Sequence, residues 1–562
     1  MSTHSGYQRL RAHSIHEDSD DIQTFYGKRA KWALFISLGL AAYIYSLDGT
    51  TTYTYLTYAA SEFGGHSLLG PIQVAQGIII AVGKPVIAKV ADVGSRGTAY
   101  CGVLFFYVIG YAAIATAQNI QTVVVGIVLY AIGYTGLQLL TQVVIADITT
   151  LKWRGLVLSL NSLPFLINAF VGSNISAAII EHAGWRWGYG MFIILIPIAI
   201  APLIVTLLWS ERITRRNGLT REVKKGYIQS FLDTAAELDA VGLLLIGASI
   251  SLTLLPLSLA KHTAGSGNGA GMLLGIFLLG LILIPIFALW DFKWAKYPVI
   301  PFRFVVNKSV VGASLIGAFD FMAFYLTFTY LYSFVIVVKD WKLINTTYFM
   351  QTQMIAMTLC GIFTGMYMHM FQRYKTLLVS GLVVRLMGVA LMLHSRGADG
   401  SNFELLMTQI LQGVGGGIAA LSIQVSAQAS VPHADVAMAT AAVLLITEFG
   451  AAGGGAIAGA IWSSQMPSKL AEHLPFLSQP ERDILFSSIT EAAGKPRGDP
   501  VREGVISAYG DVMRTMVLVA TAVSVLPILV ALVMPDWYLG NVQNAVDCSP
   551  VDADAQPAEQ ED

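Results

Sequence analysis

Long apolar runs alternate with short polar segments over almost the whole chain. A helix needs about 20 mostly apolar residues to cross the hydrocarbon core of a bilayer. Runs of that length lie at 33–58, 68–91, 99–117, 120–147, 156–180, 188–209, 239–260, 270–290, 309–337, 347–370, 376–394, 403–428, 437–463 and 515–534. The pattern therefore predicts an all-α integral membrane protein with fourteen transmembrane helices.

The polar segments divide these spans into two groups of six with an inserted pair between them. A polar segment at 466–511, too long for a simple connector, predicts a long outer loop before the last span. The expected parts are an N-terminal tail at 1–31, a six-helix bundle at 32–209, a basic loop with inserted helices seven and eight and a following loop at 210–308, a second six-helix bundle at 309–534, and an acidic tail at 535–562.

Lysine and arginine residues set the expected orientation. With the N-terminus in the cytoplasm, the inner segments hold 20 of these residues and the short outer loops hold 5. Because basic residues concentrate in cytoplasmic loops, both termini are expected in the cytoplasm. Residues 1–31 lack the apolar core of a signal peptide. We expect a multi-pass protein of the plasma membrane, with an endosomal or vacuolar membrane as the alternative.

Composition narrows the chemistry. Hydrophobic residues make up 55% of the chain and charged residues 12%, whereas soluble proteins carry about 25% charged residues. This balance excludes a secreted disulfide scaffold, a disordered chain and a basic nucleic-acid-binding protein. The spans show neither metal-ligand spacing nor a phosphate-binding loop. We therefore expect no resident metal or cofactor and no enzyme, and an ion gradient as the energy source.

The two groups of spans resemble each other. Spans four and twelve each begin with small residues and place a glutamine about two turns later, Gln142 and Gln424. The first span of each group carries an acidic residue among aromatic side chains, Asp48 and Asp320. Such internal repeats are typical of secondary transporters that bind substrate between their two halves.

This architecture resembles the major facilitator superfamily in its fourteen-helix form. The loop after span two supports the resemblance, because Asp92 is followed by a glycine and a basic residue, as in the superfamily pattern. Gly94 and Ser95 depart from that pattern, which has another residue and then glycine at these two positions, before the basic residue Arg96. The resemblance implies two bundles that rock about a central cavity. Asp92 would cap a helix or pair with Arg96 and hold one conformation.

Further motifs resemble the fungal siderophore–iron transporter family over about residues 25–540. Span five also lacks the Gly-Pro that drug–proton antiporters usually carry. The motifs are DGTT at 48–51, ADITTLKWRG at 146–155, PFLINAFV at 164–171, GWRWGYGMF at 184–192, and PVRE at 500–503 with Ala508, Tyr509 and Arg514.

The resemblance implies a proton-coupled symporter that imports ferric siderophores by alternating access and so serves iron homeostasis. Its partners would be iron bound through its chelator, protons and the lipid bilayer, and the protein would act as a monomer that binds no nucleic acid. Two alternatives stay open: a proton-coupled exporter or exchanger of organic solutes such as drugs or thiol peptides, and a transport-dead membrane sensor.

Charged residues inside the spans are the candidates for proton coupling. Each costs at least about 2.5–3.5 kcal/mol at the bilayer centre and so marks a substrate or proton path. Asp48, Asp320 and Glu448 could load and release a proton within each cycle. The alternative is a carboxylate permanently paired with Lys84 or Arg385. A structural ion pair is the main expectation for Arg385, because its span corresponds to a peripheral helix of the superfamily.

Aromatic and amide side chains are the candidates for substrate binding. Aromatic stripes in spans one and nine suit the wall of a cavity for a bulky iron chelate, although helix packing explains such stripes equally well. Asp147 and Arg154 would form a gate or a solvated helix end, with Lys84, Asp92, Arg96 and Arg385 as further gate or ion-pair residues. The candidate substrate-binding residues are Tyr53, Tyr55, Gln142, Asn161, Asn168, Phe324, Tyr325, Phe328, Gln424 and Tyr509.

Overall fold

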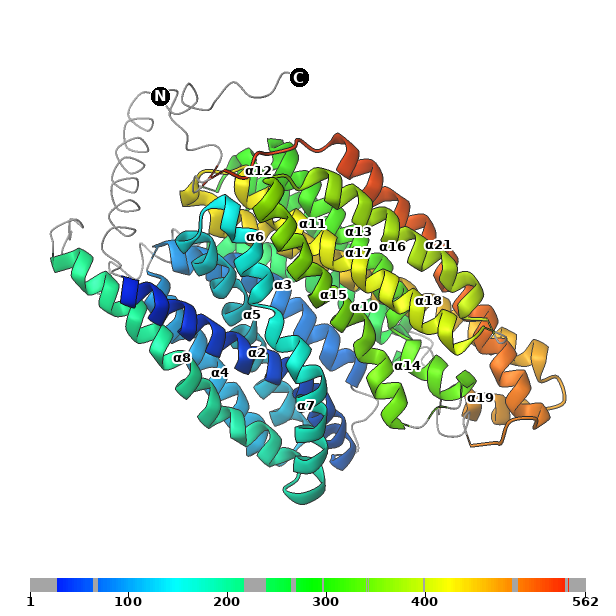
Figure 1. The fold of residues 1–562 in the computed structure, drawn as a ribbon. Helices are drawn as coiled ribbons and strands as arrows, with labels where there is room; N and C mark the ends of the chain where they lie inside the picture. The colour runs from blue at the N-terminus through cyan, green and yellow to red at the C-terminus, as the bar shows by residue number, and fades with distance from the viewer. Residues whose placement is uncertain are drawn as a thin grey trace.

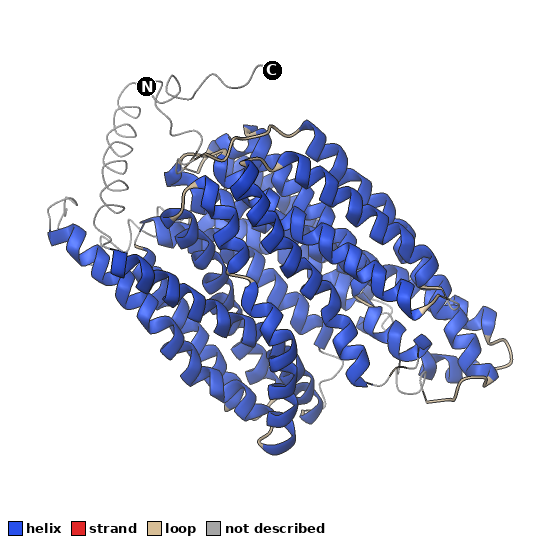
Figure 2. Cartoon of the chain, viewed as in Figure 1, coloured by secondary structure: helices blue, strands red, loops and turns tan. Residues whose placement is uncertain are grey.

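The computed structural model describes residues 28–63, 69–93, 95–216, 239–263, 269–295, 298–339, 341, 343–397, 400–487, 494–540 and 544. All regular structure within these residues is helical (Figure 2). The long helices run roughly parallel and antiparallel to one another and form two bundles that lie side by side (Figure 1).

The first bundle comes from the N-terminal part of the chain. Its helices pack in the pairs α2 with α8, α4 with α5, and α4 with α8. Ser95 caps the start of α4 and Asn119 caps the start of α5, each by accepting a hydrogen bond from a backbone N–H of the first turn. The helices are α2 (Lys28–Glu62), α3 (Leu69–Val93), α4 (Arg96–Ala115), α5 (Ile120–Ile148), α6 (Leu151–Leu160), α7 (Leu163–His182) and α8 (Trp185–Arg216).

Two inserted helices, α10 (Ala240–Thr263) and α11 (Gly269–Lys293), pack on each other, and α10 also contacts α3 and α18. The second bundle follows. Its helices are α12 (Phe302–Val306), α13 (Lys308–Phe328), α14 (Leu331–Phe334), a π-helix (Val335–Lys339), α15 (Leu343–Phe371), α16 (Lys375–Ser395), α17 (Asn402–Ala429), a 3-10 turn (His433–Asp435), α18 (Val436–His473), α19 (Gln479–Ser487) and α21 (Pro500–Val533).

Twelve helical segments of the described chain are long and apolar enough to cross a membrane. The two other long helices of the described chain are α3 and α10. Both occupy the places expected for spans two and seven, yet the count of fourteen spans stays a prediction.

Two expected spans are broken helices. The fifth is interrupted at Asn161–Ser162 between α6 and α7, where Pro164 occupies the first turn of α7 and cannot continue the hydrogen bonding of α6. The ninth is interrupted at Thr329–Tyr330 and ends in the π-helix. Hydropathy alone cannot detect such breaks, because the residues around them stay apolar.

Three arginines, of which Arg396 and Arg502 are buried, donate hydrogen bonds to backbone carbonyls around the second break. Arg396 donates to the carbonyl of Thr327, Arg502 to that of Ile336 at 3.3 Å, and Arg497 to that of Val338 at 3.1 Å. Carbonyls near an interrupted helix lack their usual partners and need other donors. Arg502, noted in the sequence only as part of a family motif, therefore stabilises the irregular end of the ninth span.

Most of the described residues in the segment 466–511 are helical, which corrects the expectation of a long loop. Helix α18 continues to His473, α19 covers Gln479–Ser487, and α21 begins at Pro500. Apolar side chains of both extensions, among them Leu470 and Val505, are buried in one core. Packing of this amphipathic surface explains why a sequence too polar to span a membrane still forms helices.

The two bundles meet along two helix pairs, α3 with α18 and α6 with α15. Glycine allows the second pair to approach closely, because a Cβ added to Gly365 would lie 2.7 Å from the carbonyl oxygen of Gly155. Helix α2 begins and α21 ends at the same end of the molecule, which we call the terminal end (Figure 1). The α6–α15 contact lies toward the terminal end.

Candidate substrate and proton site

Asp48 lies inside the first bundle within a cage of three tyrosines. Its side chain is fully buried, Tyr107 and Tyr111 of α4 donate to its two carboxylate oxygens, and Tyr130 of α5 donates to Oδ2 at 3.1 Å. Within the described chain, Asp48 has no ion-pair partner. A carboxyl group in this position is held by hydroxyl groups alone.

Close packing of α4 and α5 builds the cage. A Cβ added to Gly110 would lie 2.4 Å from the backbone nitrogen of Tyr130, and one added to Gly133 would lie 2.7 Å from Cα of Tyr107. The tyrosine rings also pack on each other, with ring centroids 4.8 Å apart for Tyr111 and Tyr130. Only glycine lets the two backbones come this near. The sequence interpretation missed the three tyrosines, although the i, i+4 spacing of Tyr107 and Tyr111 in an apolar span was an available signal.

Asp320, at the corresponding place in the second bundle, forms an ion pair with Arg385 instead. Arg385 Nε lies 2.6 Å from Asp320 Oδ1, and Arg385 Nη2 donates to the backbone carbonyl of Asp320 at 3.0 Å. Both side chains are 6% exposed. Helix α17 leaves room for the guanidinium at Gly416, where an added Cβ would lie 2.3 Å from Arg385 Nη1. The pair ties α13 to α16.

Glu448 is paired across the interface between the bundles. Its Oε1 lies 2.7 Å from Nζ of Lys84, which is fully buried on α3, whereas the Glu448 side chain keeps 24% of its surface exposed. The two residues belong to α18 and α3, so this ion pair joins the two halves. Two of the three candidate carboxylates are thus held by a cation, and Asp48 is held by phenols.

Partly exposed aromatic side chains from both bundles lie near these charges. In the first bundle Tyr45 stacks on Tyr134 at 4.7 Å, and the exposed Gly49 lies beside the Tyr134 hydroxyl. In the second bundle Phe324 stacks on Phe328 at 4.8 Å, and Tyr325 is 36% exposed. Tyr134 and Tyr325 lie near each other and near Glu448. An aromatic surface therefore flanks the interface of the halves.

The other candidate substrate-binding residues fall into two groups. Gln142, Gln424 and Asn161 are half-buried, and Oε1 of Gln142 and Nε2 of Gln424 have no hydrogen-bond partner within the described chain. Tyr55 and Tyr509 are buried in helix packing, against Tyr189 and Trp462, and buried Asn168 donates to the carbonyl of Tyr43. Tyr55, Tyr509 and Asn168 therefore stabilise helix packing. The side chains of Tyr53 and Asp92 lie outside the described part of the structure.

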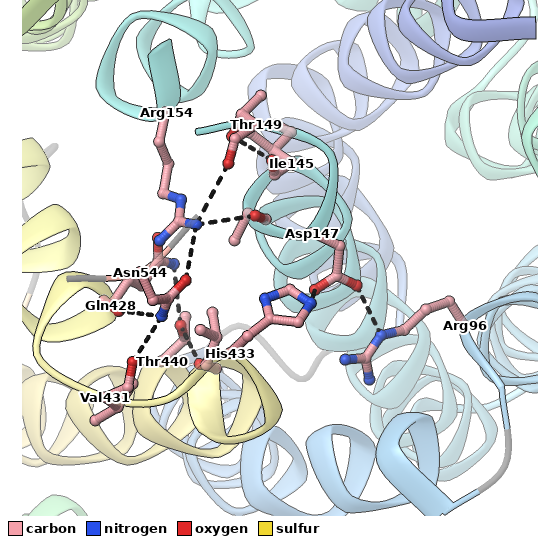
Figure 3. Close-up of polar contacts among 12 residues, drawn as sticks. Arg96, Ile145, Asp147, Thr149, Arg154, Gln428, Val431, His433, Thr440 and Asn544 are labelled. Atoms are coloured by element: carbon pink, nitrogen blue, oxygen red, sulfur yellow. Dashed lines mark hydrogen bonds and ion pairs between the residues drawn. The ribbon is translucent and has the colours of Figure 1, made fainter. Parts of the chain in front are cut away.

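A polar network links the two bundles at the terminal end (Figure 3). Arg96 Nε lies 3.0 Å from Asp147, and His433 of the second bundle lies 3.7 Å from the same carboxylate. Arg154 donates to the carbonyl of Ala146 at 3.0 Å and to Oδ1 of Asn544 at 3.3 Å. The sequence interpretation joined Asp147 to Arg154 as one gate. In the structure Asp147 contacts Arg96 and His433, and Arg154 contacts Asn544, a residue that the sequence did not single out.

Comparison with solved structures supports the fold. The structural alignment with the proton:xylose symporter XylE covers 93% of this chain and 99% of the XylE chain, with a TM-score of 0.53 and 12% sequence identity. The human organic anion transporter MFSD10 gives a TM-score of 0.51 at 10% identity, covering 88% of this chain and 99% of its own. At these identities the likeness concerns the fold alone.

Several curated relatives are more similar to this chain in sequence than these solved structures are. The siderophore iron transporter mirC of Emericella nidulans is 33% identical over 91% of this chain and 85% of its own length, and the MFS siderochrome iron transporter C of Aspergillus fumigatus is 32% identical over 96% and 91%. The low affinity heme transporter str3 of Schizosaccharomyces pombe is 32% identical over 93% and 84%. The family model "Major Facilitator Superfamily" matches residues 38–399. The chain is therefore a member of the major facilitator superfamily and a transporter rather than an enzyme.

Proposed function

We propose that this protein imports ferric siderophores by proton-coupled alternating access. The similarity to transporters named for siderophore iron supports the substrate class. The described residues contain no group of three or more His, Cys, Asp or Glu side chains that could hold a metal ion. Iron would accordingly cross the membrane inside its organic chelator, which the protein contacts through aromatic and amide side chains.

The observation that carries proton coupling is the difference between Asp48 and the two other acidic residues. Arg385 and Lys84 are buried cations, and protonation of their carboxylate partners would leave these charges without a counter-charge, so both favour ionised partners. A phenol both donates and accepts. When Asp48 takes up a proton, one of its three tyrosines can turn from donor to acceptor and keep the group fully hydrogen-bonded. Asp48 is therefore the proton carrier, whereas Asp320 and Glu448 stay paired.

The substrate site lies between the bundles, next to the proton carrier. Tyr45 and Tyr134 line it from the first bundle, and Phe324, Tyr325 and Phe328 line it from the second. Gly49 follows Asp48 directly and is exposed beside Tyr134. A change in the hydrogen bonding of Asp48 is thus one residue away from the surface that the chelate contacts. Gln142 and Gln424 supply amide groups for its carbonyl oxygens.

The membrane placement follows from the basic residues. We infer that the terminal end faces the cytoplasm, because α6, α12 and the loop between α15 and α16 carry lysine and arginine there. The protein would act as a monomer in the plasma membrane, with the closed terminal end shown in Figure 3 as the state that accepts substrate from outside.

Uptake of radioiron by cells that lack their own siderophore transporters tests the proposal. Cells expressing this chain would receive ferric hydroxamate siderophores, ferric catecholate siderophores or haem, each with and without a protonophore. The expected result is uptake of at least one ferric siderophore that the protonophore abolishes. Uptake of haem alone would overturn the substrate class, and protonophore-resistant uptake would overturn the coupling.

A further inference from the structure

The chain after α21 crosses the terminal end as an extended segment and contacts both bundles. Residues 535–540 contain no regular structure, yet Leu539 is fully buried. Asn544, the next described residue, is fully buried as well. We call residues 535–540 together with Asn544 the strap. The sequence predicted only an acidic tail here.

The first part of the strap is fixed to the second bundle. Trp537 Nε1 donates to Oγ of Ser309 at 2.8 Å, and the backbone nitrogen of Leu539 donates to the carbonyl of Gln372 at 2.9 Å. Arg373 Nη1 lies 3.3 Å from the carboxylate of Asp536. These partners come from α13 and from the turn between α15 and α16. All of them belong to one half of the molecule.

The second part of the strap reaches the first bundle. The backbone nitrogen of Lys152, in the first turn of α6, donates to the carbonyl of Gly540 at 3.1 Å. N–H groups in the first turn of a helix have no partner within that helix. The carbonyl of Gly540 supplies the missing acceptor, although its segment is anchored on the second bundle. Arg154, two residues further along α6, donates to Oδ1 of Asn544 at 3.3 Å.

Asn544 connects the halves through a single side chain. While its Oδ1 accepts from Arg154, its Nδ2 donates to the carbonyl of Gln428 at 2.9 Å and to that of Val431 at 2.6 Å. Gln428 lies in the last turn of α17, where helix carbonyls lack partners. Figure 3 shows the amide between Arg154 on one side and Gln428 and Val431 on the other. Both amide atoms are therefore used, one toward each bundle.

We propose that the strap is a lock that holds the terminal end closed, with Asn544 as the positioning residue that must leave Arg154 before the bundles separate at that end. The proposal rests on the alternating-access cycle proposed above, but it requires no particular substrate. Separation of α6 from α17 would pull Asn544 between two sets of partners that it cannot then satisfy together. Opening thus requires the strap to release α6 while it stays on the second bundle.

Distance distributions between two spin labels on the full chain test the lock. The native cysteines Cys101, Cys360 and Cys548 are replaced by serine, and labels are placed at the exposed residues Arg212 on α8 and Val306 on α12, one on each bundle at the terminal end. The substitution N544A removes the contacts to both halves. The matched control is D536N, which weakens the strap within the second bundle only.

We expect N544A to raise the ratio of terminal-end-open to terminal-end-closed molecules about tenfold, equivalent to about 1.4 kcal/mol, and D536N to leave the distribution as in the parent. Equal distributions in N544A and the parent would overturn the proposal. An equal shift in N544A and D536N would also overturn it, because the strap would then act by general docking. The measurement needs no substrate, so failure of siderophore uptake does not decide its outcome.

Discussion

Lys84 Nζ lies 2.7 Å from Glu448 Oε1, and this ion pair joins helix α3 of the first bundle to helix α18 of the second. Lys84 is fully buried, and Glu448 supplies the counter-charge of its ammonium group. Glu448, one of the three candidate proton carriers, is therefore held by a cation. Its role can be separated from that of Asp48 by substitution.

Removing one member of the pair destabilises the protein more than removing both. E448Q leaves the ammonium of Lys84 buried without a counter-charge, and we expect the free energy of unfolding to fall by about 1–3 kcal/mol. In K84M/E448M no charge is left, so most of that loss should be regained. Thermal unfolding of the purified variants measures both values. Proton-driven uptake should survive in the double variant; its loss would reassign proton carriage to Glu448.

Substitution of Asp48 separates proton coupling from movement of substrate. An asparagine keeps hydrogen bonds with Tyr107, Tyr111 and Tyr130 but cannot take up a proton. We expect D48N to exchange substrate across proteoliposome membranes down its gradient, and to lose accumulation driven by a pH gradient. Paired measurements of exchange and of pH-driven uptake distinguish the two activities.

Asp320 provides the matched comparison. D320N leaves the guanidinium of Arg385 buried and unpaired, which costs about 3–5 kcal/mol of stability. Exchange and driven uptake should therefore fall together in D320N, in parallel with the amount of folded protein. Accumulation against a gradient by D48N, or its selective loss in D320N, would assign the proton to the second bundle.

The helical architecture follows from hydropathy, whereas the site depends on contacts between distant spans. Asp48 was evident as a charge in an apolar run, but its partners Tyr107, Tyr111 and Tyr130 come from two other helices. Tyrosines in spans are usual in packing, so the i, i+4 spacing of Tyr107 and Tyr111 did not by itself connect them to Asp48. The cage depends on how closely α4 approaches α5, and Gly110 and Gly133 determine that distance.

Ion pairs show the same limit. The sequence admitted a span carboxylate paired with Lys84 or Arg385, and Arg385 does lie 2.6 Å from Asp320. A charge in an apolar run says nothing of the direction its side chain takes about the helix axis, so the sequence could not assign Glu448 to Lys84. Asn544 could not be found at all, because it lies in a polar tail and its partners, Arg154 and the carbonyls of Gln428 and Val431, come from distant parts of the chain.

Glu62 forms a pH-dependent contact at the end of the first bundle that lies opposite the terminal end. This residue lies beyond the apolar span Trp32–Thr52, and its carboxylate accepts hydrogen bonds from Trp185 Nε1 at 2.5 Å and from Arg186 Nη1 at 2.8 Å. These hydrogen bonds, first from Trp185 and then from Arg186, hold the pKa of Glu62 below its ordinary value of 4.5. The ionised form is therefore favoured in the folded protein.

A lowered pKa in the folded state stabilises the protein above the ordinary pKa, and this contribution is lost as the pH falls through the lowered value. We expect the melting temperature of the parent to exceed that of E62Q near pH 6, and the difference to vanish on acidification below pH 4.5. The contribution is small because the ion pair is exposed. A difference that does not change with pH would show that the Glu62 charge is irrelevant.

Gly365 sets how closely the bundles meet at the terminal end. A Cβ added there would lie 2.5 Å from Oγ of Ser159 and 2.7 Å from Cα of Leu156, both on the other bundle. At Gly361, one turn earlier on α15, the nearest atom would be 4.0 Å away. Overpacking of this kind costs about 1–3 kcal/mol. In G365A that cost falls on the closed state alone, because opening separates α15 from α6.

We expect G365A to shift molecules toward the terminal-end-open state and to slow uptake, and G361A to behave like the parent in both respects. The spin-label distances described for the strap measure the shift, and initial rates of radioiron uptake measure the activity. A combined variant, G365A/N544A, should open the terminal end further than either change alone, since one acts on α6–α15 packing and the other on the strap. Equal effects of G361A and G365A would show that the α6–α15 contact does not control closure.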